Sequence, residues 1–157
     1  MNIIAIDPGK SGGLAVWDGS RAHIFNCPET QKEILELVFN IYERFGPNLK
    51  AYIEKVHSWG KHPSRCPKCK SIIMMPQGSK SIWTFAENYA SWKMALLALE
   101  IPLEEISVSK WQRKLGTLPK DKQDRKREIK RRMQLAYPYL KITLKTADAL
   151  AILSAVK

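Results

Sequence analysis

The chain has 157 residues, which is enough for one domain with a substantial core and too few for two ordinary domains. Its 26 Lys and Arg residues outnumber its 15 Asp and Glu residues, and the formal charge of +11 favours nucleic-acid phosphate as a partner. No apolar run approaches the roughly 20 residues of a membrane span, and no secretory signal opens the chain. Three cysteines argue against a secreted disulfide scaffold, so we expect a single cytoplasmic domain over residues 1–157 with no membrane contact.

Three short β-favouring runs open the chain. They predict strands at 2–7, 13–18 and 21–26, and the short glycine-containing turns between them predict an antiparallel meander. Apolar residues at three-to-four spacing predict a helix over 29–44, which Gly46 and Pro47 end. A fourth strand is predicted over 50–56.

The second half of the chain begins with a segment that has no periodicity. Residues 57–80 are rich in Pro, Gly, Cys, Lys and Ser, which predicts an irregular basic loop. We then expect a long helix over 81–99, a strand over 103–108, a short helix over 111–115 capped by Ser109, a basic helix over 120–136 and a last helix over 146–156. This order predicts an α/β domain with a mixed sheet flanked by helices.

Three acidic residues occupy positions that suggest chemistry. Asp7 ends the first strand, Glu54 lies late in the fourth, and Asp148 lies in the first turn of the last helix. Adjacent strands and a helix packed across them could bring the three together, and carboxylates without histidine or thiolate suit Mg²⁺ or Mn²⁺. Each acid also has a simpler interpretation, as a turn aspartate, a surface glutamate and a helix N-terminal charge respectively.

Three segments carry a resemblance to a known family. They are I-A-I-D-P-G-K-S-G-G-L-A-V-W at 4–17, A-Y-I-E-K-V at 51–56 and T-A-D-A-L-A-I-L at 146–153, supported by I-P-L-E-E-I-S-V-S-K-W-Q-R-K-L-G at 101–116. In order and spacing they resemble the RuvC Holliday-junction resolvases of the RNase H-like superfamily, especially the short phage-type members.

The resemblance implies a fold, an activity and a set of site residues. It implies an RNase H-like five-stranded mixed sheet in a homodimeric endonuclease, which makes paired nicks in a four-way DNA junction during recombination and repair. The cuts would be hydrolytic and metal-dependent, would leave 5′-phosphate and 3′-hydroxyl ends, and would occur in a bacterial cell or phage-infected host. By motif match, Asp7, Glu54 and Asp148 would be the catalytic acids that bind Mg²⁺ or Mn²⁺.

Lys145 departs from the family pattern. The family usually has an acid or a histidine three residues before the last aspartate, and this chain has Lys145 there. A charged lysine cannot ligate Mg²⁺, so Lys145 either assists catalysis by steadying a phosphate or a water, or only flanks the site. Either one ion or two is compatible with this arrangement.

Other functional classes are alternatives or are excluded. An RNase H-like nuclease that acts on flaps, forks or RNA, and a non-catalytic junction-binding protein, stay as alternatives. A nucleotide cofactor is not expected, because the phosphate-loop glycine that should precede Gly9-Lys10-Ser11 by five residues is replaced by Ile4. The chain is also too short for the second half of an actin-like ATPase.

Two basic segments are candidates for DNA contact. In the loop these are Trp59, Lys61, Arg65, Lys68, Lys70 and Lys80, and in the basic helix they are Lys122, Arg125, Lys126, Arg127, Lys130 and Arg131. Trp59 could stack on an unpaired base. The alternative for the helix is a solvated surface stabilised by neighbouring opposite charges. Trp83, Tyr89, Trp92 and Met94 on the long helix are predicted to be core or dimer contacts, and Trp111 to be core.

Cys66-Pro67-Lys68-Cys69 has the spacing of a zinc half-site, with His57 and His62 upstream. Four ligands within thirteen residues are tight for a tetrahedral ion, and the chain has no second Cys pair. The same loop of a second subunit would complete the ligand count. The alternative is a loop with two reduced thiols.

Overall fold

The computed structural model describes residues 1–56, 61–66, 68–69, 71–76 and 78–157, with the backbone alone for 61–65 and 73–76. A five-stranded sheet of order β3-β2-β1-β4-β7 forms its centre. The strands β1 (Asn2–Asp7), β2 (Gly13–Trp17) and β3 (Ala22–Asn26) form an antiparallel meander. By contrast, β4 (Leu49–Glu54) is parallel to β1, and β7 (Leu103–Ile106) is parallel to β4. The predicted mixed sheet is confirmed, and the first and fourth strands are neighbours in it.

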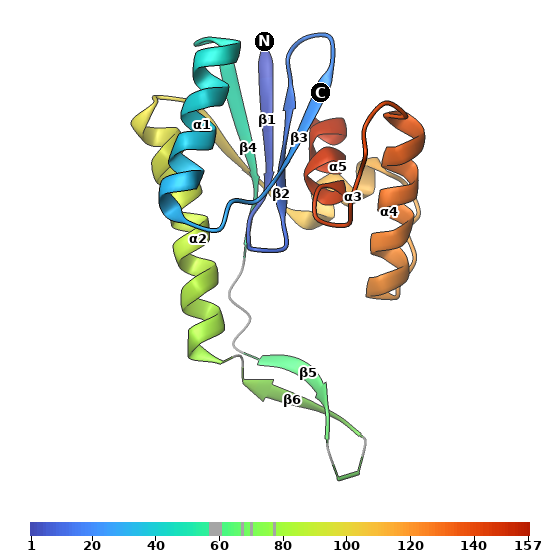
Figure 1. The fold of residues 1–157 in the computed structure, drawn as a ribbon. Helices are drawn as coiled ribbons and strands as arrows, with labels where there is room; N and C mark the ends of the chain where they lie inside the picture. The colour runs from blue at the N-terminus through green and yellow to red at the C-terminus, as the bar shows by residue number, and fades with distance from the viewer. Residues whose placement is uncertain (57–60, 67, 70, 77) are drawn as a thin grey trace.

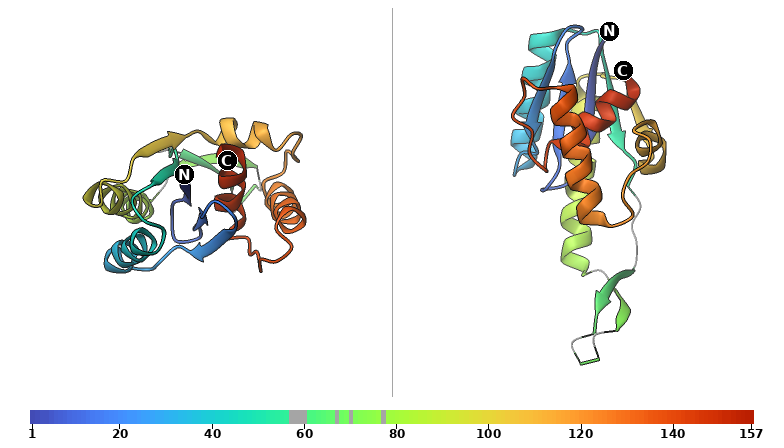
Figure 2. Two further views of the ribbon diagram at one scale, coloured as in Figure 1. Left: turned by 90° about the horizontal axis from the view of Figure 1, so that it is seen from above. Right: turned by 90° about the vertical axis from the view of Figure 1, so that its right-hand side faces the viewer.

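Helices cover both faces of this sheet (Figures 1 and 2). One face carries α1 (Gln31–Phe45) and α2 (Ser79–Ala98), and the other carries α3 (Val108–Lys114), α4 (Lys122–Ala136) and α5 (Ala147–Val156). Alternate residues of β1 serve the two cores: Ile4 and Ile6 pack toward α1 and α2, and Ile3 and Ala5 toward α5. Because both faces are buried, β1 is a continuous apolar run. No helix in the described part of the chain is both long and apolar enough to span a bilayer.

The boundary between β7 and α3 differs from the prediction. Ser107 is the N-cap of α3, where its hydroxyl accepts a hydrogen bond from the backbone N–H of Lys110. The strand therefore ends at Ile106, and Ser109 lies inside the helix. The prediction of Ser109 as the cap is wrong, because Ser107 offers the same hydroxyl two residues earlier, directly after the strand.

The segment predicted to be an irregular loop contains a β-hairpin. Strands β5 (Lys61–Arg65) and β6 (Ile72–Pro76) pair in an antiparallel sheet of their own, and the N–H of Cys66 donates to the carbonyl of Ser71 at 2.8 Å. The β-favouring residues at 72–75 are sufficient to pair, although turn residues surround them. Figure 1 shows the hairpin and the first turns of α2 projecting from the end of the main sheet where β1 and β4 finish.

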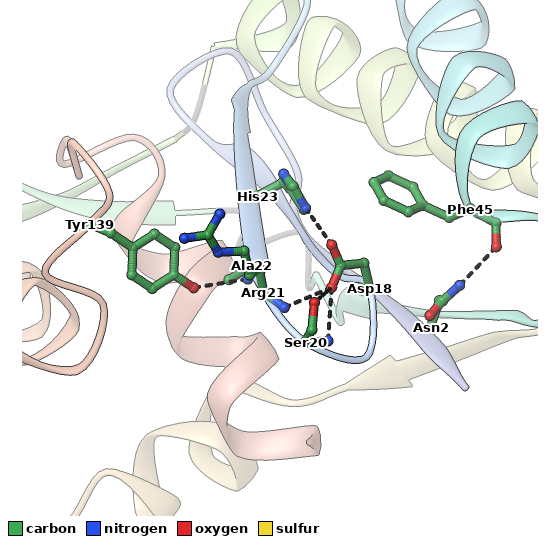
Figure 3. Close-up of polar contacts among 8 residues, drawn as sticks. All are labelled: Asn2, Asp18, Ser20, Arg21, Ala22, His23, Phe45 and Tyr139. Atoms are coloured by element: carbon green, nitrogen blue, oxygen red, sulfur yellow. Dashed lines mark hydrogen bonds and ion pairs between the residues drawn. The ribbon is translucent and has the colours of Figure 1, made fainter.

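At the opposite end of the sheet, hydrogen bonds stabilise the turn between β2 and β3 (Figure 3). The Asp18 carboxylate accepts hydrogen bonds from the backbone N–H groups of Ser20 and Arg21 at 2.8 and 2.7 Å. Ala22 begins the edge strand β3 and donates its N–H to the Tyr139 hydroxyl at 2.9 Å. This bond ties the segment between α4 and α5 to the sheet, and that segment leads directly to Asp148.

Candidate active site

Three carboxylates lie at one end of the main sheet. Asp7 and Glu54 are the last residues of β1 and β4, and the residues just before them, Ile6 and Ile53, are register partners in the parallel pair. Helix α5 packs across β1 and β2 and carries Asp148 in its first turn. Two of the predicted acids thus lie at the carboxyl ends of adjacent strands, where ligands commonly bind in open α/β folds, and α5 supplies the third.

The acids lie in a poorly solvated environment that penalises their charge. Burial, with added repulsion from Glu54 and Asp148, raises the pKa of Asp7 from 3.8 to about 8. Burial likewise raises the pKa of Glu54 and that of Asp148. Without a bound divalent cation, the Asp7 carboxyl group is therefore mostly protonated at neutral pH.

Trp111 is buried in the core, as predicted, and also reaches the acid cluster. Its indole N–H donates to an oxygen of Glu54 at 2.9 Å, which orients that carboxylate and opposes the rise in its pKa. Sequence patterns carry no signal of this contact, because the two residues lie 57 positions apart.

Two glycines of the motif after β1 allow close packing around Asp7. A Cβ on Gly12 would lie 2.0 Å from the Asp7 carbonyl oxygen, and a Cβ on Gly13 would lie 2.9 Å from the Lys145 carbonyl oxygen. Neither contact is sterically tolerable. Glycine at these positions therefore lets the loop fold onto Asp7 and lets the segment before α5 approach the sheet.

A buried asparagine on α2 fixes the same loop. The side-chain carbonyl of Asn88 accepts the N–H of Gly9 at 2.7 Å, and its amide donates to the Cys27 sulfur at 3.3 Å. Asn88 is 8 % exposed, so these bonds form away from bulk water. Sequence reasoning did not identify Asn88, whose contacts depend on the packing of α2 against the β1–β2 loop.

The cation beside the acids comes from α4. The Lys126 ammonium lies 3.9 Å from an Asp148 oxygen, and its charge lowers the pKa values of Asp7, Glu54 and Asp148 against the effect of burial. Lys145 is exposed, and among the described residues its ammonium forms no ion pair with the acids. Its assisting role in catalysis stays a prediction. Lys126 was predicted only to contact DNA.

The donor set at this site suits a divalent cation. Within the described residues, no three His, Cys, Asp or Glu side chains already lie close enough to share one metal ion. The Asp7 carboxylate, however, has no hydrogen-bond or ion-pair partner in the part of the chain that the structure describes. A partly buried carboxylate without a partner is costly, and Mg²⁺ or Mn²⁺ would compensate its charge with the oxygen ligands it prefers.

Comparison with known proteins agrees on the fold. No protein-family model and no curated protein sequence matches the chain. A structure of T. thermophilus RuvC in complex with Holliday junction substrate matches with a TM-score of 0.62 and 17% identity, over 97% of this chain and 89% of that one. A second Thermus thermophilus RuvC structure matches with a TM-score of 0.60 and 18% identity, over 97% and 90%. The chain has the RNase H-like fold of RuvC. The predicted fold class and the resemblance in fold are confirmed.

Several cations of α4 have partners within the RuvC-like domain. The Arg125 guanidinium donates to the carbonyls of Pro119 and Lys120, and Arg131 pairs with Glu128 at 2.8 Å. Arg127 approaches Asp124 at 3.5 Å. Lys122 and Lys130 form no ion pairs with the described residues, so they are the freest candidates for phosphate contact on this helix.

The DNA-contact candidates among residues 57–80, together with the two histidines of that segment, fall into three groups. Lys68 and Lys80 are exposed. Lys61 and Arg65 lie on β5, as does His62, and only their backbone is described. Trp59, Lys70 and His57 lie outside the described residues. Contact of this segment with DNA stays a prediction.

The remaining predictions concern α2 and the cysteines. Trp92 is a core residue, as predicted, whereas Trp83 is 67 % exposed and Met94 is exposed as well. These two side chains are free for the predicted dimer contact. Cys66 and Cys69 form no disulfide and lie in the turn of the hairpin, between β5 and β6.

Proposed function

We propose that the protein is a structure-specific DNA endonuclease that resolves four-way junctions by paired, metal-dependent nicks. The observation that carries this proposal is the convergence of Asp7, Glu54 and Asp148 at one end of a sheet with the RuvC fold. The matched RuvC was solved with a Holliday junction substrate, and the charge of +11 on this chain favours a phosphate-rich partner.

The three acids have defined roles in this proposal. Asp7, Glu54 and Asp148 would hold Mg²⁺ or Mn²⁺. The bound cation would supply an activated water and would stabilise the leaving oxygen, which gives 5′-phosphate and 3′-hydroxyl ends. Trp111 fixes one oxygen of Glu54 by hydrogen bonding and leaves the other free to accept a ligand.

Two lysines have separate roles. Lys126 limits the repulsion among the acids and would attract the scissile phosphate. Lys145 sits in the exposed segment just before α5, from which it would steady the DNA backbone.

The surroundings of the acids support a branched substrate. Figure 1 shows the hairpin, the start of α2 and the helix α4 around the end of the sheet that carries the acids. Lys68, Lys80, Lys122 and Lys130 from these elements would contact the junction arms. Two opposed strands require two sites, so we propose a homodimer with one site in each protomer, acting in the cytoplasm of a bacterial cell or phage-infected host.

Cleavage assays test the proposal directly. A mobile four-way junction, a flap and an RNA–DNA hybrid would be incubated with the purified protein and Mg²⁺ or Mn²⁺. We expect symmetric nicks in the junction, and we expect Asp7→Asn to abolish them while junction binding persists. Cleavage by the Asp7→Asn variant at the rate of the unmodified protein would contradict the assignment. Preference for the flap or the hybrid would favour a related nuclease instead.

One observation favours a second candidate, a junction-binding protein without nuclease activity. The ion pair with Lys126 already compensates part of the negative charge of Asp148. In addition, no three potential ligands among the described residues lie close enough to share an ion. Tight junction binding without nicking in either metal would favour this candidate.

A further inference from the structure

The projecting hairpin lacks the support that a two-stranded sheet needs. Strands β5 and β6 are five residues each and pair only with one another, and Figures 1 and 2 show them clear of the main body. An isolated hairpin of this size is marginally stable in water. Ile72, at the start of β6, is 75 % exposed, so no core of the described chain covers it. The hairpin therefore needs a further cross-link or partner to be stable.

The turn of the hairpin carries two thiols. Cys66 directly follows β5, and its N–H bonds to the Ser71 carbonyl at 2.8 Å, which closes the turn. The Cys69 sulfur, in the same turn, lies 2.8 Å from the Ser71 hydroxyl. A Cys-x-x-Cys pair at the tip of a hairpin is the arrangement of half a structural zinc site.

The described part of the chain does not supply the other half. No third His, Cys, Asp or Glu among the described residues joins the two thiols. His62 precedes Cys66 by four residues along the strand direction, which is about 13 Å at roughly 3.3 Å per residue and too far for both to share one ion. A matching pair of thiolates is available on a second copy of the same hairpin.

We propose that the hairpins of two copies of this chain share one zinc ion, with Cys66 and Cys69 of each as its four ligands. Two identical pairs related by a twofold axis complete a tetrahedral site without any further residue. Residues 57–80 contain five Lys or Arg and no acid, so two apposed hairpins repel each other. Four thiolates around Zn²⁺ carry a net charge of about −2, which offsets part of that repulsion.

The zinc site has a consequence that rests on the proposed function. The hairpins project from the ends of the sheets that carry the acids (Figure 1). A zinc ion between them would fix the two basic hairpins relative to one another.

The test measures zinc and mass without DNA. The full chain, purified in reducing buffer after expression with zinc, would be examined by plasma mass spectrometry for metal and by light scattering for molar mass. We expect one zinc ion for every two chains in a dimer, complete loss of zinc in Cys66→Ser and Cys69→Ser, and unchanged zinc in Lys68→Ala from the same turn. Because the hairpin strands form a sheet separate from the main one, unchanged far-ultraviolet circular dichroism would show that the variants fold.

Cobalt provides a second measurement on the unmodified protein. Co²⁺ in place of zinc should give the strong visible absorption and the thiolate charge-transfer bands of a tetrahedral four-thiolate site. One zinc per chain, zinc that survives Cys66→Ser, or a protein without zinc would overturn the proposal. Loss of nuclease activity alone would not, because none of these measurements depends on catalysis.

Discussion

Asp7 provides a stability test of the acid cluster that needs no DNA. Burial and the two neighbouring acids raise its pKa from the ordinary 3.8 to about 8. The folded protein therefore holds a proton that the unfolded chain releases at much lower pH. Stability is greatest below the unfolded pKa and is lost as the pH rises from about 4 to about 8. Asn at this position is neutral at every pH and avoids the loss.

The size of the effect follows from the pKa. Each pKa unit corresponds to about 1.4 kcal/mol, and pH 7 lies about three units above the unfolded pKa and still below the folded one. Without metal, Asp7→Asn should therefore stabilise the fold by up to about 4 kcal/mol at pH 7 and by almost nothing near pH 4. At about 2 to 4 °C per kcal/mol for a domain of this size, the melting temperature should rise by about 8 to 16 °C.

Urea unfolding in EDTA, followed by circular dichroism from about pH 4 to about pH 8, measures this difference. Mg²⁺ should reduce the difference in stability between Asp7→Asn and the unmodified protein, because it should stabilise the unmodified protein by about 2.7 kcal/mol at a hundredfold excess over the dissociation constant. Asp18→Asn is the control with the opposite sign. Hydrogen bonds from His23 and the turn lower the pKa of Asp18, so that variant loses stability at neutral pH and recovers it in acid. If the stability advantage of Asp7→Asn over the unmodified protein does not grow with pH, the raised pKa of Asp7 is refuted.

Three further substitutions probe the groups around the acids. Trp111→Phe removes the hydrogen bond to Glu54, so it should raise the pKa of that acid and reduce stability by about 2 kcal/mol. The acidic limb of the cleavage pH profile should then move to higher pH, and a limb that stays at the same pH would argue against the contact. Asn88→Ala leaves the buried N–H of Gly9 unpaired and should reduce the free energy of unfolding in urea by about 1 to 3 kcal/mol. It should also reduce nicking more than it reduces junction binding, whereas equal losses of nicking and binding would indicate a purely structural role. Lys126→Met removes the cation beside Asp148. Calorimetry above pH 8 should show tighter Mn²⁺ binding by this variant, while its DNA binding should be weaker. Weaker Mn²⁺ binding would contradict this expectation.

The sheet could be predicted from the sequence because its signals are local. The continuous apolar run of β1 and the glycines after it define a buried strand and a tight turn without reference to the rest of the chain. The hairpin at 61–76 was missed because Pro63, Cys66 and Pro67 suggest irregular structure, while pairing depends on the register between two separate strands. Ser107 and Ser109 offer equivalent caps, and only the end of β7 decides between them.

The acids were also predictable, whereas their partners were not. Asp7, Glu54 and Asp148 each follow from a motif and the element that carries it. The contact of Trp111 with Glu54 depends on how α3 packs against the sheet, and no pattern within a few residues encodes that packing. Lys126 was recognised as basic, but its approach to Asp148 depends on the rotation of α4 against α5.

The energetics of the cluster bear on whether the protein is a nuclease or only a binder. Three partly buried carboxylates destabilise the fold at neutral pH, and their negative charge also repels the DNA phosphates that the basic surface attracts. A protein that only bound junctions would gain both stability and affinity from neutral residues at these positions. A divalent cation reverses both effects, because it neutralises the acids and attracts a phosphate to them. If the acids serve catalysis, Mg²⁺ should therefore raise stability and strengthen junction binding in the unmodified protein, and both gains should shrink in Asp7→Asn.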